Sequence, residues 1–502
     1  MKYLFILFCC LPSIFLLGQN KFDYVWVSGT GSPDTIKRNT LLNFNTDPPT
    51  PTLFGGIYEF EKTGSICNAQ GELQFMTNGC YVLNKYGSLM QGGDSLSYDP
   101  NGYNPCFGYP GAAAPGHQGI IILPNPSNLN QYYIISKIDG AVAGILMERK
   151  IFYSLVDMTL NSGLGKVVLK NKLLLTDAFY PPDISASRHA NGRDWWLLFP
   201  QRYTNKYFRF LLTPAGIETY PPQSLGPPTT GGDGSGNAIF SPDGAKYIRY
   251  NPKDRAFIFD FNRCEGTLSN AQVINVADTA YRGSAAVSPN SRYLYINTSV
   301  RIYQFDLLAS DIQLSRKKVA LWDRFVDSTY GAPQPTRFDN MMLGPDGKIY
   351  IQCNSGARYL HRINFPDLAD TLCQVEQRAI LMPHLYYAGG TYFPNYRLGR
   401  LVGSSCDTLA TAIAEVEQLG ELRVQPNPAS DLLHIAYHTE NTTALIVAIS
   451  DYTGKKLQTL SLDPSSGSLD INTSALPNGL YLCTLYDSAT NRQQSVKFVV
   501  MR

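Results

Sequence analysis

Residues 238–251 have the sequence AIFSPDGAKYIRYN, in which a short apolar run leads into Pro-Asp-Gly and then into an aromatic-rich strand. Proline fixes φ at the first position of a tight turn and glycine accepts a positive φ, so the run predicts a β-hairpin. The same pattern recurs in AAVSPNSRYLYINT from Ala285, MMLGPDGKIYIQCN from Met341, SRHANGRDWWLLF from Ser187, SICNAQGELQFMTN from Ser65 and LPNPSNLNQYYIIS from Leu123.

The predicted turns follow one another at intervals of roughly 50–60 residues. They lie near Gln70, Asn128, Asn191, Asp243, Asn290 and Asp346. Hairpins at such a period indicate a radial repeat, most simply an all-β fold with a β-propeller over residues 19–408. Seven blades are favoured and six are the alternative. We expect the seventh blade to combine an N-terminal strand near Phe22–Val27 with late strands such as Thr391–Leu398.

The composition favours a β-rich protein of more than one domain. Of 502 residues, 12% are aromatic, 42 are Gly and 32 are Pro, a balance typical of strands joined by tight turns. A chain of this length exceeds one ordinary core. The net charge of +2 and the lack of any dense Lys/Arg run in the sequence predict no nucleic-acid partner.

The chain starts with MKYLFILFCCLPSIFLLGQN, which is typical of a secretory signal peptide over residues 1–18. One lysine precedes an apolar run that ends at Leu17, and small Gly18 stands at the expected cleavage point. The run is too short for a transmembrane helix and no later stretch is long and apolar enough, so no transmembrane segment is predicted. We therefore expect the mature protein in an oxidising compartment, where disulfides form.

Eight cysteines follow the signal peptide: Cys67, Cys80, Cys106, Cys264, Cys353, Cys373, Cys406 and Cys483. They allow 105 pairings, so their connectivity stays open. The predicted hairpins place Cys67 and Cys80 at opposite ends of one blade, roughly 20 Å apart, which argues against that pair. Cys80 with Cys106 is an alternative. Neither CxxC nor His-x-x-His spacing occurs, and we predict no metal site and no cofactor.

The last eighty or so residues differ from the rest. Residues 409–421 are predicted to be a linker, and alternating apolar strands split by PNP, TGK, PNG and ATN turns follow over residues 422–502. Strands at this spacing predict a small immunoglobulin-like β-sandwich.

This segment resembles the C-terminal sorting domain of the type IX secretion system of Bacteroidetes at ten positions. They are Pro426, Asn427, Pro428, Asp451, Gly454, Lys455, Pro477, Gly479, Tyr481 and Lys497. The resemblance implies that the type IX machinery is a partner and that the protein crosses the outer membrane. It also implies that the protein is released or stays attached at the surface, usually after the sorting domain is removed.

Most of residues 60–408 resemble an uncharacterised propeller-like family of exported Bacteroidetes proteins. The resemblance rests on GELQFMTNGCYVLNKYGSLMQGGDSL, RHANGRDWW, FSPDG, FDFNRCEG, PDGKIYI and FPNYRLG. It implies a fold and no chemistry.

The run RHANGRDWW holds the candidate ligand-binding residues His189, Asn191, Arg193, Asp194 and Trp195. We hypothesise that they lie near a propeller face, where aromatic rings and polar groups suit a glycan. The simpler interpretation, which the repeated pattern favours, is a hairpin whose polar residues cap its own turn and bond to the next blade. Trp195 and Trp196 are consecutive on a strand, so they should point to opposite faces and pack between blades.

Other segments offer weaker candidates. TGGDGSGN, residues 230–237, lacks the helix and lysine of a phosphate-binding loop and is expected to connect blades. Residues 98–119 form a predicted long loop that contains His117. The scattered acids Asp99, Asp139, Asp183 and Asp339 lack the spacing of a glycosidase pair, and no catalytic residue is assigned.

The sequence thus favours an exported propeller that recognises a glycan, a peptide or an envelope protein without catalysis. An extracellular glycan-cleaving hydrolase or lyase is one alternative, and a structural envelope component is another. Fold alone does not choose among these functions.

Overall fold

The computed structural model describes residues 20–29, 38–55, 63–98, 118–139, 149–178, 184–229, 236–276, 278, 280, 282–329, 331–353, 356–386, 392–407, 421–438, 445–451, 456–462, 467–487 and 493–502. The chain divides into two compact units, Met1–Asp407 and Thr408–Arg502. Two short 3-10 turns, η1 (Asn161–Gly163) and η2 (Asp370–Cys373), are the helical elements among these residues, and the fold is all-β as predicted. No helix within the described ranges is long and apolar enough to cross a membrane.

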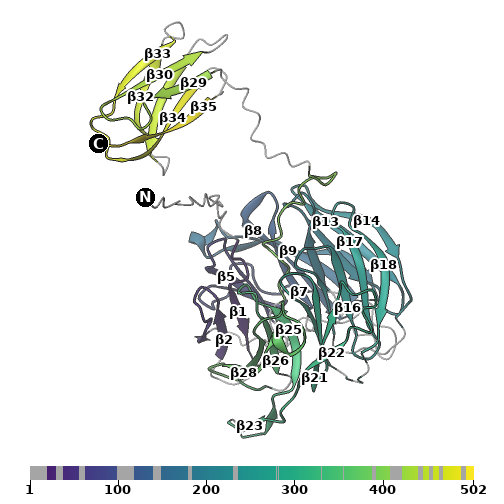
Figure 1. Ribbon diagram of the computed structural model, residues 1–502. Coiled ribbons are helices and arrows are strands. Elements are labelled where there is room, and N and C mark those ends of the chain that lie inside the picture. The colour runs from purple at the N-terminus through teal and green to yellow at the C-terminus, as the bar shows by residue number, and fades with distance from the viewer. Residues whose placement is uncertain are drawn as a thin grey trace, which may run out of the picture. The chain divides into compact units, whose positions relative to one another are not determined.

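Seven antiparallel sheets of three or four strands make up the described part of the first unit (Figure 1). In chain order they are β1 (Val25–Ser28), β2 (Arg38–Asn43) and β3 (Thr50–Gly55); β4 (Gly64–Cys67), β5 (Leu73–Thr77) and β6 (Val82–Asn84); β7 (Ile120–Asn125), β8 (Asn128–Asp139), β9 (Arg149–Asp157) and β10 (Lys166–Asp177); β11 (Ser185–Arg188), β12 (Trp195–Pro200), β13 (Lys206–Thr213) and β14 (Gly216–Ser224); β15 (Asn237–Phe240), β16 (Lys246–Tyr250), β17 (Ala256–Asn262) and β18 (Thr267–Ile274); β19 (Ala285–Val287), β20 (Tyr293–Asn297), β21 (Arg301–Asp306) and β22 (Lys317–Leu321); and β25 (Phe338–Leu343), β26 (Ile349–Cys353), β27 (Tyr359–Ile363) and β28 (Val375–Leu381). A small hairpin, β23 (Val326–Asp327) and β24 (Gln334–Pro335), stands between the last two sheets.

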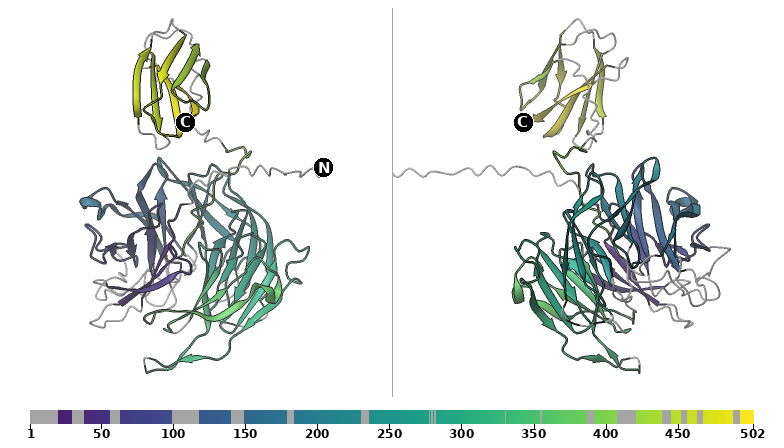
Figure 2. Two further views of the ribbon diagram at one scale, coloured as in Figure 1. Left: turned by 60° about the vertical axis from the view of Figure 1, so that its left-hand side comes forward. Right: turned by 90° about the vertical axis from the view of Figure 1, so that its right-hand side faces the viewer.

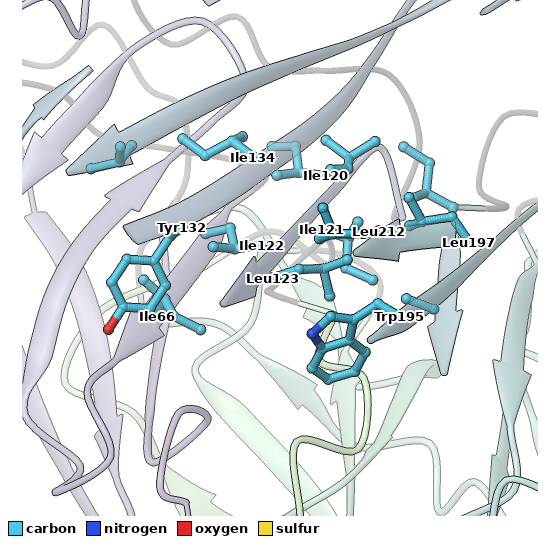
Figure 3. Close-up of a cluster of buried hydrophobic side chains, with 14 of the residues drawn as sticks. Ile66, Ile120, Ile121, Ile122, Leu123, Tyr132, Ile134, Trp195, Leu197 and Leu212 are labelled. Carbon is cyan, nitrogen blue, oxygen red and sulfur yellow. The ribbon is translucent and has the colours of Figure 1, made fainter. Parts of the chain in front are cut away.

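Apolar side chains bridge every neighbouring pair of sheets. Figure 3 shows Ile66, Ile122 and Trp195, which come from the second, third and fourth sheets, in one cluster. The other five bridges include Trp196 with Tyr247, Ile248 with Leu294, Tyr295 with Ile351, Tyr350 with Trp26, and Val27 with Met76. The bridge between Tyr350 and Trp26 joins the seventh sheet to the first, so the sheets close into a ring. The first unit is therefore a seven-bladed β-propeller, whose blades fan around a centre in Figure 2.

The first strands of neighbouring blades contact one another, as β15 contacts β11 and β19, so these strands line the central channel. The turn between the first and second strand of a blade is called its first turn here. All six hairpins predicted from the sequence are first turns, of blades two to seven. Their local chemistry identified them correctly.

The predicted closure of the ring is wrong for residues 392–398. These residues form no strand, and the first blade consists of β1, β2 and β3 alone. Pro394 has no N–H for a ladder. The segment instead lies beside the N-terminal residues through its side chains: Phe393 packs on Trp26, and Arg397 pairs with Asp23. Thr391 lies outside the described residues.

One disulfide joins Cys264 to Cys406, which are 142 residues apart in the sequence. Cys67 is free and buried, so the sequence argument against a Cys67–Cys80 bridge is confirmed. Cys80 is itself disulfide-bonded, and Cys106 lies outside the described residues. Burial raises the pKa of the Cys67 thiol far above its usual value, which keeps the thiol protonated and unreactive.

The second unit is a sandwich of two antiparallel sheets, as predicted. One sheet contains β29 (Glu421–Gln425), β30 (Leu432–His438) and β33 (Ser468–Asn472), and the other contains β32 (Lys456–Leu462), β31 (Leu445–Asp451), β34 (Gly479–Asp487) and β35 (Gln493–Val500). Apolar residues from both sheets, such as Leu433 and Leu485, share one core. The predicted signal peptide and residues 409–420 of the predicted linker lie outside the described residues.

Candidate functional sites

The polar residues of RHANGRDWW meet in the first turn of blade four. His189 Nδ1 accepts the backbone N–H of Asn191 at 3.0 Å, so Nε2 carries the proton and donates to the carbonyl of Cys264 at 3.0 Å. Asn191 Oδ1 accepts the backbone N–H groups of Arg193 and Asp194 at 2.9 and 3.0 Å. Arg193 Nε donates to Asp194 Oδ1 at 2.7 Å. The turn therefore uses these side chains to cap itself and to contact blade five.

In blade five a serine caps the corresponding turn, through a different backbone N–H. Ser241 Oγ accepts the N–H of Lys246 at 2.9 Å and donates to Asp243 Oδ1 at 2.5 Å in the first turn of blade five. His189 takes the place of Ser241 in the repeated pattern, and its longer side chain also reaches the neighbouring blade. The predicted hairpin, with polar residues that cap its turn and bond to the next blade, is therefore what the structure shows.

The two tryptophans point to opposite faces, as expected from their adjacency. Trp195 is fully buried between blades three and four, and Trp196 lies between blades four and five. The Arg188 guanidinium stacks over the Trp195 ring at 3.9 Å and donates to the carbonyl of Arg193 at 2.5 Å. Trp195 is brought next to the polar turn but has no exposed surface for a ligand.

Residues 392–407, called the tail, cross the turn end of the channel and are fastened to blades four and five. Arg263 donates to the carbonyls of Arg188 at 2.9 Å, His189 at 3.2 Å and Gly399 of the tail. Burial lowers the pKa of Arg263 to about 10, which leaves the side chain charged at neutral pH. We call this set of contacts, with the Cys264–Cys406 disulfide, the latch.

Two glycines of the repeated turns make room for the tail. Gly192 has φ +75°, and a Cβ there would lie 2.5 Å from the backbone nitrogen of Arg400. Gly244 has φ +71°, and its Cβ would lie 2.7 Å from Leu398. Both positions therefore favour glycine for two reasons. Their φ is positive, and the tail leaves no room for a Cβ.

Residues 395–397 of the tail join the N-terminal residues to the propeller. Arg397 donates two hydrogen bonds to the Asp23 carboxylate, at 2.6 and 2.9 Å. Burial acts to lower the pKa of Arg397, but Asp23 outweighs it and the pKa is raised. The buried Tyr396 hydroxyl donates to the carbonyl of Ile122 at 2.6 Å, and Asn395 donates to that of Pro242 at 2.7 Å. The motif FPNYRLG was recognisable in the sequence, but its role in anchoring the tail was not.

A pocket of about 360 Å³ lies beside the tail, at the turn end of blades five to seven. First-turn prolines of three successive blades line it, namely Pro242, Pro289 and Pro345. Half-buried Met342 and Phe393 contribute further apolar surface. None of the five candidate residues of RHANGRDWW lines this pocket, although Ala186 of the same blade does.

Of the four candidate acids, Asp339 is the one whose side chain lies within the described residues. Asp339 is almost fully buried on β25, with Arg282 Nη1 at 3.6 Å from its carboxylate. Asp99, Asp183, His117 and most of the 230–237 loop lie outside the described residues, as does the side chain of Asp139. No three His, Cys, Asp or Glu side chains in the described segments are placed to hold a metal ion.

In the second unit, the residues of the PNP and PNG turns hold the last strand. Asn427 Oδ1 accepts the N–H of Val499 at 2.9 Å, and its Nδ2 donates to the carbonyl of Lys497 at 3.3 Å. Asn478 Oδ1 accepts the N–H of Arg502 at 3.0 Å, and the Arg502 guanidinium reaches the carbonyl of Thr473. These turns therefore fix β35 and the arginine that follows it.

The remaining motif residues occupy strand ends or the core. Tyr481 donates to the carbonyl of Pro477 at 2.7 Å and stacks on Phe498 with ring centroids 5.7 Å apart. Asp451 ends β31 and Gly479 begins β34. Pro426 and Pro428 flank Asn427, whereas Gly454 and Lys455 lie outside the described residues.

Comparison with known proteins supports the assignment of this unit. Residues 423–501 match the secretion system C-terminal sorting domain. The protein thus carries the sorting domain for type IX export to the cell surface or the extracellular space. No curated protein matches the chain.

Several solved structures are similar to the chain. A putative 6-phosphogluconolactonase from Bacteroides uniformis is 13% identical, covers 74% of this chain and 99% of its own, and has a TM-score of 0.46. PorZ, a surface component of the type IX secretion system of Porphyromonas gingivalis, is 12% identical, with 93% and 73% coverage and a TM-score of 0.29. The Dos1 propeller is 9% identical, with 71% and 81% coverage and a TM-score of 0.34. Similarity at this level carries no activity over to this chain.

Proposed function

We propose that this type IX cargo recognises a ligand without catalysis, and that the ligand binds in the pocket beside the tail. The observation that supports the proposal is that the tail covers only part of the turn end of the channel. The tail covers the first turns of blades four and five, while a pocket of about 360 Å³ stays open at blades five to seven. Volumes of this order are typical of small-ligand sites.

The polar groups near the channel end favour binding over catalysis. In the latch, His189 is held between a backbone N–H and a backbone carbonyl, and Asp194 pairs with Arg193. In the pocket, Asp23 is engaged by Arg397. A general acid or base needs to reach the proton that it transfers, and these groups already hold protein partners. We therefore assign RHANGRDWW to the latch in this proposal.

A binding and turnover assay tests the proposed function. The mature full-length protein is incubated with a panel of polysaccharides and peptides, and bound ligand is measured alongside new reducing ends and new peptide termini. We expect binding without turnover. Cleavage of any panel member would contradict non-catalytic recognition, and silence across the panel would favour a structural envelope component.

The export of the protein is tested by deletion of residues 422–502. The truncated protein should accumulate in the periplasm, because it lacks the domain that the secretion machinery recognises. Thr484→Ala, at a half-buried position of β34 outside the core, is the control and should be exported normally. Undiminished secretion of the truncated protein would overturn the role of the sorting domain.

A further inference from the structure

We propose that the pocket beside the tail accepts one uncharged apolar group, such as an aromatic or branched aliphatic moiety, rather than a sugar. This inference rests on the proposed function and names the ligand class of the same site. Its starting point is the lining of the pocket, which combines turn prolines with Met342 and Phe393.

The repeated turn motif produces the apolar rim. Three consecutive hairpins have a proline at the same position, namely Pro242, Pro289 and Pro345. The propeller fold therefore places these three side chains on one side of the channel end. Blade four has Ala190 at this position, and the tail covers it through the Leu401 N–H, which donates to the Ala190 carbonyl at 2.7 Å. Pro289 and Pro345 therefore lie where the tail leaves the channel end open, and Pro242 lines the pocket at its border with the tail.

Charge complementarity indicates a neutral ligand. The two charged side chains that line the pocket, Asp23 and Arg397, neutralise each other through two hydrogen bonds. Asn395 is also engaged, because its Nδ2 donates to Pro242 and its Oδ1 accepts the N–H of Arg397 at 3.0 Å. Tyr392 supplies the remaining polar side chain. A charged ligand would lose hydration here without gaining an ionic partner.

The lining of the pocket also disfavours a sugar as the ligand. Sugar recognition needs polar side chains that bond hydroxyls next to a flat aromatic surface. Most side chains that line this pocket are apolar, and its charged and amide groups already have protein partners. Flexible methionines such as Met341 and Met342 adapt to apolar groups of different shape.

Fluorescence titration of the mature full-length protein with N-phenyl-1-naphthylamine, an uncharged apolar fluorophore, tests this ligand class. We expect saturable binding at one site. Met342→Gln should weaken binding about tenfold, because a polar amide of similar size would face the apolar ligand. The matched variant Met342→Leu should bind like the parent. Pro345→Ser, at a half-buried position of the first turn of blade seven, is a second variant and should weaken binding less.

Competition by N-acetyl-phenylalaninamide identifies the source of the group. Displacement of the fluorophore would assign the site to an apolar side chain of a peptide, and binding without displacement would assign it to a free small molecule. Both results support an apolar ligand. Displacement by cellohexaose would overturn the ligand class while leaving recognition intact. No saturable binding, or equal binding by the parent and Met342→Gln, would overturn the inference, and cleavage of either competitor would overturn the proposed function instead.

Discussion

The first turns of blades four and five and those of blades six and seven share one sequence pattern but differ in what covers them. In blades four and five, Gly192 and Gly244 lie against the tail. In blade six, Ser291 stands at the corresponding position with φ 61°, and in blade seven a Cβ on Gly347 would meet only Pro289, at 3.7 Å. Turns with the same sequence pattern thus differ in function according to whether the tail, which is not part of the repeat, covers them.

The largest effect is expected for the ion pair that anchors the tail. Asp23→Ala would leave the mostly buried Arg397 without its carboxylate, and we expect the free energy of unfolding to fall by about 3–5 kcal/mol in a denaturant titration. The control is Asp94→Ala, which removes a more exposed pair with Lys170 and should cost at most about 1 kcal/mol. Equal losses in the two variants would contradict an anchoring role for Asp23.

Removal of the latch disulfide should have the next largest effect. The double variant Cys264→Ser, Cys406→Ser should lose about 2–4 kcal/mol of stability under oxidising conditions, because the bridge closes a long loop in the unfolded chain. The amide of Leu401 should also exchange with solvent faster, since it bonds to Ala190 next to the latch. Unchanged exchange at Leu401 would show that the disulfide does not hold the tail.

Glycine substitutions separate the two kinds of turn. Gly192→Ala and Gly347→Ala both place a side chain at positive φ, which costs about 1–2 kcal/mol in each. Gly192→Ala should lose about 1–3 kcal/mol more, because its Cβ would also collide with the Arg400 backbone. Thermal or chemical unfolding of the two variants measures this difference. If both variants lose the same stability, the tail does not crowd the turn of blade four.

The smallest effect on stability is expected on the open side. Pro289→Ser should change the free energy of unfolding by only about 0.4–1 kcal/mol, the usual consequence of losing a turn proline, yet weaken binding of the apolar fluorophore. Ala190→Ser, on the covered side, should lower the free energy of unfolding because it buries a hydroxyl, and it should leave binding of the fluorophore unchanged. A loss of binding in Ala190→Ser would mean that the ligand contacts the covered turns.

Local chemistry explains which parts of the propeller could be predicted. Six first turns were recognisable because Pro, Asx and Gly determine a tight turn from within a few residues. The adjacency of Trp195 and Trp196 likewise fixed their opposite directions. The sandwich strands from β29 onward were predictable from alternating apolar residues.

The parts that were missed depend on residues far apart in the sequence. No turn of the first blade was singled out, although Ser32-Pro33-Asp34 stands between β1 and β2. Residues 392–398 were expected to form a strand, yet they are an irregular segment. The Cys264–Cys406 bridge spans 142 residues, and nothing near either cysteine indicates its partner. The pocket draws on residues from Asp23 to Arg397, so it exists only once the ring is closed.

Hydrogen-exchange mass spectrometry with and without N-phenyl-1-naphthylamine tests most directly whether the open side of the channel end is the binding site. Ligand should slow amide exchange in the first turns of blades six and seven, around Pro289 and Pro345, and leave residues 188–194 unchanged. Slowed exchange at residues 188–194, or no change anywhere in the propeller, would contradict the assignment of recognition to this pocket.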